Sequence, residues 1–75
     1  MYKWKIEIIL NCGKEIVGRY DCDHKGSFDA AQELLTGNVY DYFAIASLDK
    51  SKQIAVKLGD VSYMAISVLE ENNET

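Results

Sequence analysis

The sequence predicts an α+β domain in which a small, antiparallel and strongly curved sheet carries one short helix, in the order ββαβββ. Three segments alternate apolar and polar residues with the period of two that a half-buried strand requires, a fourth is mainly aromatic and apolar, and the last is apolar on both faces. Between the second and third of these segments, apolar residues recur at helical spacing. Because the turns are short and the chain contains no proline, consecutive strands are expected to pair as antiparallel meanders. The pattern leaves open whether the sheet closes into a barrel.

The first two strands are predicted to form a long hairpin. Tyr2–Leu10 is the first arm, residues 11–14 are the turn, and Glu15–Asp21 is the return arm. In the turn, Gly13 supplies the positive φ that a short hairpin loop needs. The apolar face of the first arm consists of Tyr2, Trp4, Ile6, Ile8 and Leu10.

A short helix is predicted from Ser27 to about Thr36. Ser27 is the expected N-cap, Asp29 lies in the first turn near the positive end of the helix dipole, and Gly37 stands where a left-handed residue commonly ends a helix. A helix of this length depends on packing against a sheet. The face predicted to make that contact consists of Phe28, Ala31, Leu34 and Leu35.

The second half of the chain predicts three more strands. Residues 39–48 and 53–58 flank a hairpin tip at residues 49–52, and a Gly-Asp turn at residues 59–60 leads into the last strand, residues 61–69. That last strand is apolar on both faces, which predicts a central or doubly covered position in the sheet.

Length and charge limit the possible functions. The chain has 75 residues, enough for one core, so residues 1–69 are predicted to form a single domain and residues 70–75 a polar, disordered tail. Three of the twelve acidic residues lie in this tail, which leaves nine against eight basic residues and a body charge of about −1. The domain therefore lacks both the basic field of a strong phosphate binder and the dense acidic face of a nucleic-acid mimic.

Two segments resemble the Sm-like family of small RNA-associated barrels. The segment Ile8–Tyr20 is similar to the family's first motif, an alternating strand, a glycine turn and a second glycine, Gly18, where the next strand bends. The segment Val56–Ile66 is similar to its second motif, two strands joined through a Gly-Asp turn. The resemblance implies a small barrel or a curved sheet. Small, acidic, proline-free chains of this kind also resemble open reading frames of Gram-positive bacteria and their phages.

The chain departs from the Sm-like pattern where that family contacts RNA. Asp21 and Asp23 are out of step with the family's Asp and Asn, and Lys25 and Gly26 stand where the Asn is sought. Leu58 replaces the basic residue that precedes the Gly-Asp turn. The family's leading helix is missing, and the predicted helix lies between the second and third strands instead.

The densest group of potential metal ligands or acid/base residues is Asp21-Cys22-Asp23-His24. A zinc site normally takes four ligands, whereas the chain has one histidine and two distant cysteines. Cys22 and His24 could form a nucleophile and base, but nothing in the sequence supplies a third orienting group or an oxyanion site. We therefore expect a solvated connection here, with no metal, no cofactor and no enzymatic activity.

The positions of the two cysteines also indicate the redox state of the cellular compartment. Cys12 lies in the hairpin turn and Cys22 at the far end of the return arm, too far apart for a disulfide. The chain begins with an alternating strand rather than with a basic and then apolar segment, and no stretch approaches the length of a membrane span. A reduced, cytoplasmic protein without membrane contact is the expectation.

The function that the sequence favours is a non-enzymatic interaction module, either self-associating or binding a protein partner. In so small a domain, strands that are apolar on both faces leave surface that a partner must cover. The alternative is a weak single-stranded nucleic-acid binder of Sm-like shape, in which tyrosines stack on bases near Lys3 and Lys5. The residues expected to carry the interaction are Trp4, Tyr63, Met64, Ile66 and Val68.

Overall fold

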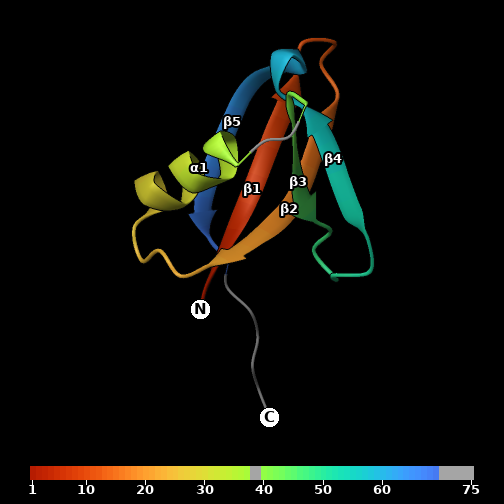
Figure 1. The fold of residues 1–75 in the computed structure, drawn as a ribbon. Coiled ribbons are helices and arrows are strands. Elements are labelled where there is room, and N and C mark those ends of the chain that lie inside the picture. Colours follow the sequence, from red (N-terminus) through yellow and green to blue (C-terminus); the bar gives the residue numbers. More distant parts are fainter. Residues whose placement is uncertain (38–39, 70–75) are drawn as a thin grey trace.

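The computed structural model describes residues 1–37 and 40–69 (Figure 1). The predicted order ββαβββ is confirmed, with one additional 3₁₀ turn before the last strand. The predicted tail at residues 70–75 and the predicted start of the third strand at Val39 lie outside the described residues. The elements are β1 (Tyr2–Leu10), β2 (Glu15–Cys22), α1 (Ser27–Thr36), β3 (Tyr42–Ala46), β4 (Gln53–Lys57), η1 (Leu58–Asp60) and β5 (Val61–Val68).

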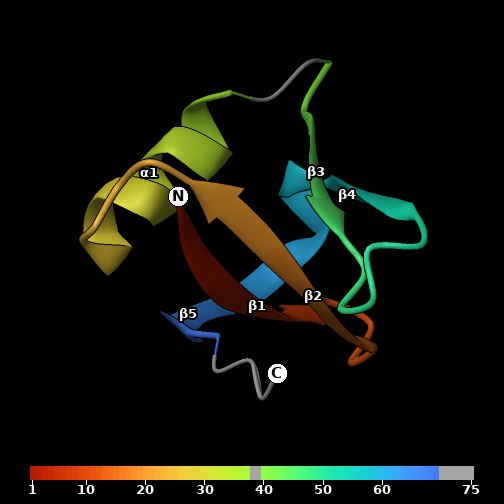
Figure 2. The same ribbon diagram turned by 90° about the horizontal axis from the view of Figure 1, so that it is seen from below.

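The five strands form one antiparallel sheet in the order β4-β3-β2-β1-β5. β1 is therefore flanked by β2 and β5, and the sheet is open, with β4 and β5 at its edges. Because the three residues of η1 join these two edge strands, the sheet curls so that its edges approach each other at that end (Figures 1 and 2). α1 lies on the inner side of the curl and contacts β5 and β3.

The core is built around the inner face of β1. Trp4, Ile6 and Ile8 are buried there, as the alternating pattern of the first arm predicts. Each has a neighbour on both sides, because β1 pairs with β2 and with β5 along nearly its whole length. The other buried apolar residues are Cys22, Ala30, Leu34, Phe43, Ile45 and Val56.

Gly18 is the point where β3 crosses close to β2. The two strands pair at a single position, Arg19 with Ala46. A Cβ atom added to Gly18 would lie 2.5 Å from the carbonyl oxygen of Ala46 and 2.7 Å from Cδ1 of Ile45. Glycine is therefore required by space rather than by a positive φ. The bend that the sequence predicts at Gly18 corresponds to this crossing.

The ends and the packing face of α1 differ from the prediction. Gly26 occupies the N-cap position without a side-chain hydrogen bond, so Ser27 begins the helix rather than capping it, and Gly37 has a φ of −84° rather than a left-handed value. Phe28 is 77% exposed, whereas Ala30 and Leu34 are buried. Phe28 precedes Ala30 by two residues, about 200° around the helix, and so points away from the sheet.

The predicted central position of the last strand is wrong, because β5 is an edge strand. On the inner face of the sheet, the apolar side chains of β5 lie beside those of β1. On the outer face, β5 carries small residues and Tyr63. A strand that is apolar on one face and uncharged on the other has the same pattern whether it lies inside the sheet or at an uncharged edge. The pattern alone therefore could not place it.

Replacing Gly18 with alanine is expected to lower the free energy of unfolding by roughly 1–3 kcal/mol, because the new methyl group would overlap the Ala46 backbone and force β3 to move. Urea unfolding followed by circular dichroism measures this loss. The matched control is Gly59→Ala, where an added Cβ meets nothing within 4 Å and φ is not positive. Equal stability of the two variants would contradict the role given to Gly18.

Candidate interaction surface

The outer edge of β5 presents backbone groups that lack a partner strand. The Leu69 N–H donates to the Lys3 carbonyl oxygen at 3.0 Å, which fixes the alternation of hydrogen-bonded pairs between β5 and β1. Tyr63, Ala65 and Ser67 therefore exchange hydrogen bonds with β1, while the N–H and C=O groups of the residues between them point outward. No strand in the described part of the chain pairs with this side of β5. The outward groups belong to Met64, Ile66 and Val68.

The side chains of these three residues lie on the inner face of the sheet. Met64 and Ile66 are half-buried against the core, whereas Val68 at the end of the strand is 64% exposed. Tyr63, which is 61% exposed, lies on the opposite face. We call the outward backbone groups of Met64, Ile66 and Val68, together with the exposed Val68 side chain, the β5 edge.

Trp4 lies away from the β5 edge. It belongs to β1, next to β5, and only 5% of its surface is exposed. Its indole N–H donates to the backbone carbonyl oxygen of His24 at 3.2 Å. The structure thus gathers four of the five predicted interaction residues on β5 and places the fifth in the core.

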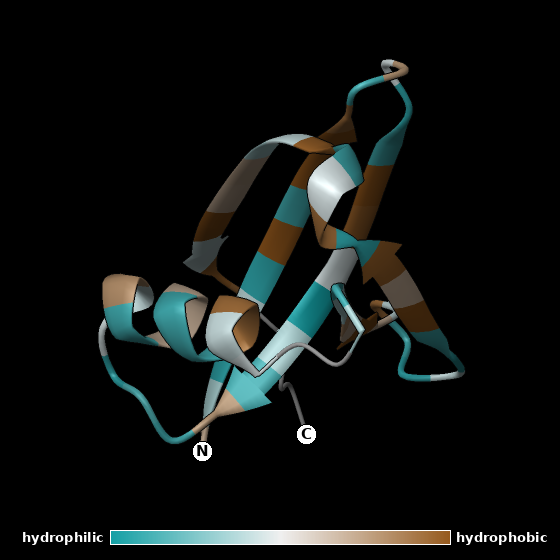
Figure 3. Cartoon of the chain, turned by 45° about the horizontal axis from the view of Figure 1, so that its top comes forward, coloured by the Kyte–Doolittle hydropathy of each residue, from teal (hydrophilic) through white to brown (hydrophobic). Residues whose placement is uncertain are grey.

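From Tyr63 to Val68, β5 carries none of the features that usually protect an exposed strand, and the one register shift in its pairing with β1 lies before this stretch, at Ser62. Its eight residues include no charged residue and no proline. In Figure 3, β1 alternates between hydrophilic and hydrophobic bands, whereas β5 has no strongly hydrophilic band. Edge strands of monomeric proteins commonly carry lysine, proline or a bulge that prevents pairing with another chain. The other edge strand, β4, is shorter, ends in Lys57 and follows Lys52.

Phe28 is a largely exposed apolar residue in the first turn of α1. In both ribbon views the first turn of α1 lies close to the carboxyl end of β5 (Figures 1 and 2). Phe28 in that turn and Val68 at that strand end are both largely exposed. The sequence reasoning assigned Phe28 to the core. The sequence carries no signal against that assignment, because Phe28, Ala31 and Leu35 have the spacing of one helix face.

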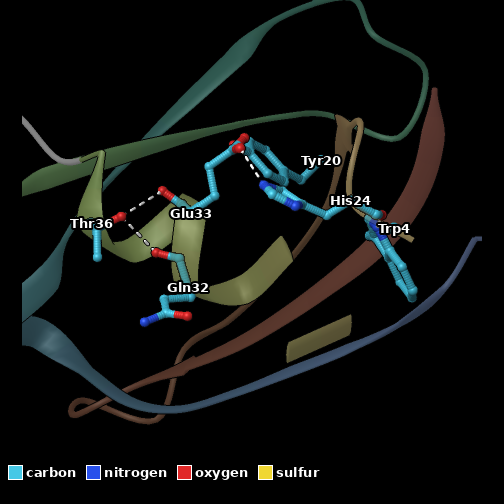
Figure 4. A network of polar contacts seen from close by, with 6 residues as sticks. All are labelled: Trp4, Tyr20, His24, Gln32, Glu33 and Thr36. Carbon is cyan, nitrogen blue, oxygen red and sulfur yellow. Dashed lines mark hydrogen bonds and ion pairs between the residues drawn. The ribbon is translucent and has the colours of Figure 1, made fainter. Parts of the chain in front are cut away.

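A polar network fastens α1 to the sheet (Figure 4). The Tyr20 hydroxyl of β2 donates to Oε2 of Glu33, and Nε2 of His24 lies 2.7 Å from Oε1 of the same carboxylate. At the end of the helix, the Thr36 hydroxyl donates to the Gln32 carbonyl oxygen at 2.8 Å. Glu33 thus joins the helix both to β2 and to the loop that precedes the helix.

The network shifts the protonation of two of its members. Burial first, and then the hydrogen bond to Glu33, raise the pKa of Tyr20 far above its ordinary value. The hydrogen bonds from Tyr20 and then from His24 lower the pKa of Glu33. The folded state therefore favours a neutral Tyr20, which donates a proton in the hydrogen bond, and an ionised Glu33, which accepts it. Such a contact stabilises the fold.

The side chains of the potential ligands at residues 21–24 point to different partners in the structure. Cys22 is buried, Asp21 accepts two hydrogen bonds from Arg19, and His24 faces Glu33. Within residues 1–37 and 40–69, no group of three or more His, Cys, Asp or Glu side chains is placed to hold a metal ion. Both Cys12 and Cys22 are free thiols.

A cleft of about 320 Å³ separates β2 from the β3–β4 hairpin. Arg19 lies beside it with a 5% exposed side chain, and its guanidinium binds Asp21 at 3.1 Å. Lys50 reaches the same carboxylate at 3.6 Å. The charged side chains that line the cleft thus form ion pairs with one another, and the pair made by Lys50 connects the β3–β4 hairpin to β2. The other lining residues are Tyr20, Ala44, Ile45, Ala46 and Gln53.

Comparison with models of protein families, with curated proteins and with solved structures gives no match. Among the described residues, no helix has the length and apolar character needed to cross a membrane.

The Tyr20–Glu33 contact predicts a loss of stability at alkaline pH. Because the folded state raises the pKa of Tyr20, the hydroxyl contact contributes to the free energy of unfolding. This contribution is fully present below the ordinary tyrosine pKa of about 10 and is lost as the pH rises through the pKa of the folded state. We expect the difference in unfolding free energy between the natural protein and Tyr20→Phe to be constant from about pH 7 to 9 and to shrink above about pH 10. Urea unfolding at a series of pH values measures this difference. Parallel stability curves would contradict the assignment.

Proposed function

We propose that this chain is a non-enzymatic interaction module that self-associates through the β5 edge. The observation that carries the proposal is an eight-residue edge strand without a charged residue, whose outward backbone groups have no partner strand in the described part of the chain. Such an edge is a template for another strand, because each added strand satisfies N–H and C=O groups that otherwise face water.

The side chains around the β5 edge support the same mechanism. Val68 is largely exposed, and Met64 and Ile66 are half-buried at the margin of the core. A strand added here would cover these three side chains on the inner face of the sheet. Each square ångström of apolar surface removed from water contributes about 25 cal/mol, so the added strand gains both hydrogen bonds and apolar contact.

The nucleic-acid alternative receives less support. A stacking platform needs accessible aromatic faces gathered beside cations, but Trp4 is buried and Tyr20 is tied to Glu33. The exposed tyrosines are distributed over β1, β3 with the residues before it, and β5: Tyr2, Tyr40, Tyr42 and Tyr63. On the outer face of the sheet, Lys5 lies 3.8 Å from Glu7, which offsets its charge. A nucleic-acid binder would show salt-sensitive binding to single-stranded RNA, whereas the interaction module would show none.

Replacing Val68 with lysine is expected to weaken self-association by about tenfold or more, because a charge at the strand edge must be desolvated when a second strand pairs there. Val68 is 64% exposed, so the fold should tolerate the change. Light scattering on a sizing column, over a range of protein concentrations and with a reductant, measures the molar mass.

Cys12→Lys is the matched control, since it adds the same charge at an exposed position in the β1–β2 turn. The natural protein and this control should associate alike, while Val68→Lys should be a folded monomer at the same concentrations. Association of Val68→Lys with undiminished strength would rule out the β5 edge as the contact.

A further inference from the structure

We propose that the occupant of the β5 edge is a second copy of this chain, whose β5 pairs antiparallel with the first about a two-fold axis at Ile66. This inference rests on the proposed function and specifies its geometry. It joins two five-stranded sheets edge to edge into one continuous sheet.

The backbone of β5 is self-complementary about Ile66. The outward groups belong to Met64, Ile66 and Val68, which are evenly spaced with Ile66 in the middle. Turning the strand about an axis at Ile66 brings Met64 opposite the partner's Val68 and Ile66 opposite the partner's Ile66. Each of these three positions then becomes a hydrogen-bonded pair that exchanges two bonds, about six bonds in all.

The inner face remains apolar across the proposed junction. Within one chain, Ile6 of β1 faces Ile66 of β5, and Trp4 faces Val68. In the dimer, the first row continues through the partner's Ile66 and the second through the partner's Met64. The exposed Val68 side chain would thereby gain an apolar neighbour on the side where it now faces solvent.

Under the same symmetry, the outer face brings no like charges opposite each other. Lys5 faces Ser67, and Glu7 faces Ala65, in the pairing of β1 with β5. The two-fold axis sets Ser67 opposite the partner's Ala65, so a row that begins at Lys5 ends at the partner's Glu7. The reverse row carries the opposite charges, and only small side chains lie between them.

The other edge of the sheet is a poorer partner for β5. The Leu58 N–H donates to the Asp41 carbonyl oxygen at 2.7 Å, so the β4 residues whose groups point outward are Gln53, Ala55 and Lys57. Pairing β4 with β5 of a neighbour would bring the Lys57 charge against an uncharged strand. Such head-to-tail pairing would also build rings or filaments rather than a closed dimer.

α1 adds a contact to the same dimer. Its first turn lies beside the carboxyl end of β5, where Val68 would meet the partner's Met64 (Figures 1 and 2). Phe28 in this turn is 77% exposed and points away from its own sheet, so it remains available to the partner subunit. The proposed axis thus accounts for the two largely exposed apolar residues at this corner of the molecule.

Disulfide trapping tests the register. With Cys12 replaced by serine, Ala65→Cys and Ser67→Cys variants are prepared separately and then mixed under mild oxidation. Ala65 and the partner's Ser67 would form a non-hydrogen-bonded pair with Cα atoms about 4.5 Å apart, within disulfide reach. The mixture should give about ten times more covalent dimer than either variant alone, because two copies of the same position lie roughly 8 Å apart in this register.

Light scattering under reduction, on the parent protein and on Ala55→Lys, distinguishes failure of the two-fold register from failure of self-association itself. The proposed dimer leaves the molar mass of Ala55→Lys unchanged, because β4 takes no part in it. Self-association without mixed cross-linking, or its loss in Ala55→Lys, would overturn the two-fold register while leaving self-association as the function. A monomer at every concentration, in the parent protein as well, would overturn both.

Discussion

The inner face of β1 is the constraint on which the rest of the molecule depends. Its three buried side chains are flanked by strands on either side and share one core cluster with Ala30 and Leu34 of α1. β1 pairs with β2 over eight residues and with β5 from Trp4 to Ile9 before the register shifts, so these two strands are positioned directly by β1. In a chain of 75 residues there is no second core to compensate if this face is lost.

Curvature of the sheet comes from two local features. Gly18 lets β3 pass close over β2, and the three residues of η1 hold the two edge strands near each other at one end. The other end is covered by α1, which Glu33 connects to β2 and to the preceding loop. The helix therefore covers an opening that an ordinary flat sheet would not have, and the polar network compensates for the shortness of its apolar face.

Local pattern predicts some elements well and leaves others undecided. The alternation of residues 2–10 gives the bounds of β1 and its buried face, and Gly13 takes the positive φ expected of the turn. The pattern could not place β5 at an edge, because the position of a strand in a sheet does not depend on that strand's own residues alone. The neighbours that decide such questions lie far away in the sequence. Phe28 was also placed wrongly, because its spacing from Ala31 and Leu35 is that of one helix face and only the structure shows that Ala30 and Leu34 are the buried positions.

The alternation of backbone groups along β5 gives this strand two populations of amide protons. The N–H groups of Tyr63, Ala65 and Ser67 are tied to β1, whereas those of Met64, Ile66 and Val68 face outward. Hydrogen exchange along the strand in an isolated subunit is therefore fast and slow at alternate residues, without any local unfolding. When a second strand pairs at this edge, all these amide protons become protected from exchange. The amides that bond to β1 therefore report on folding, and the outward amides report on assembly.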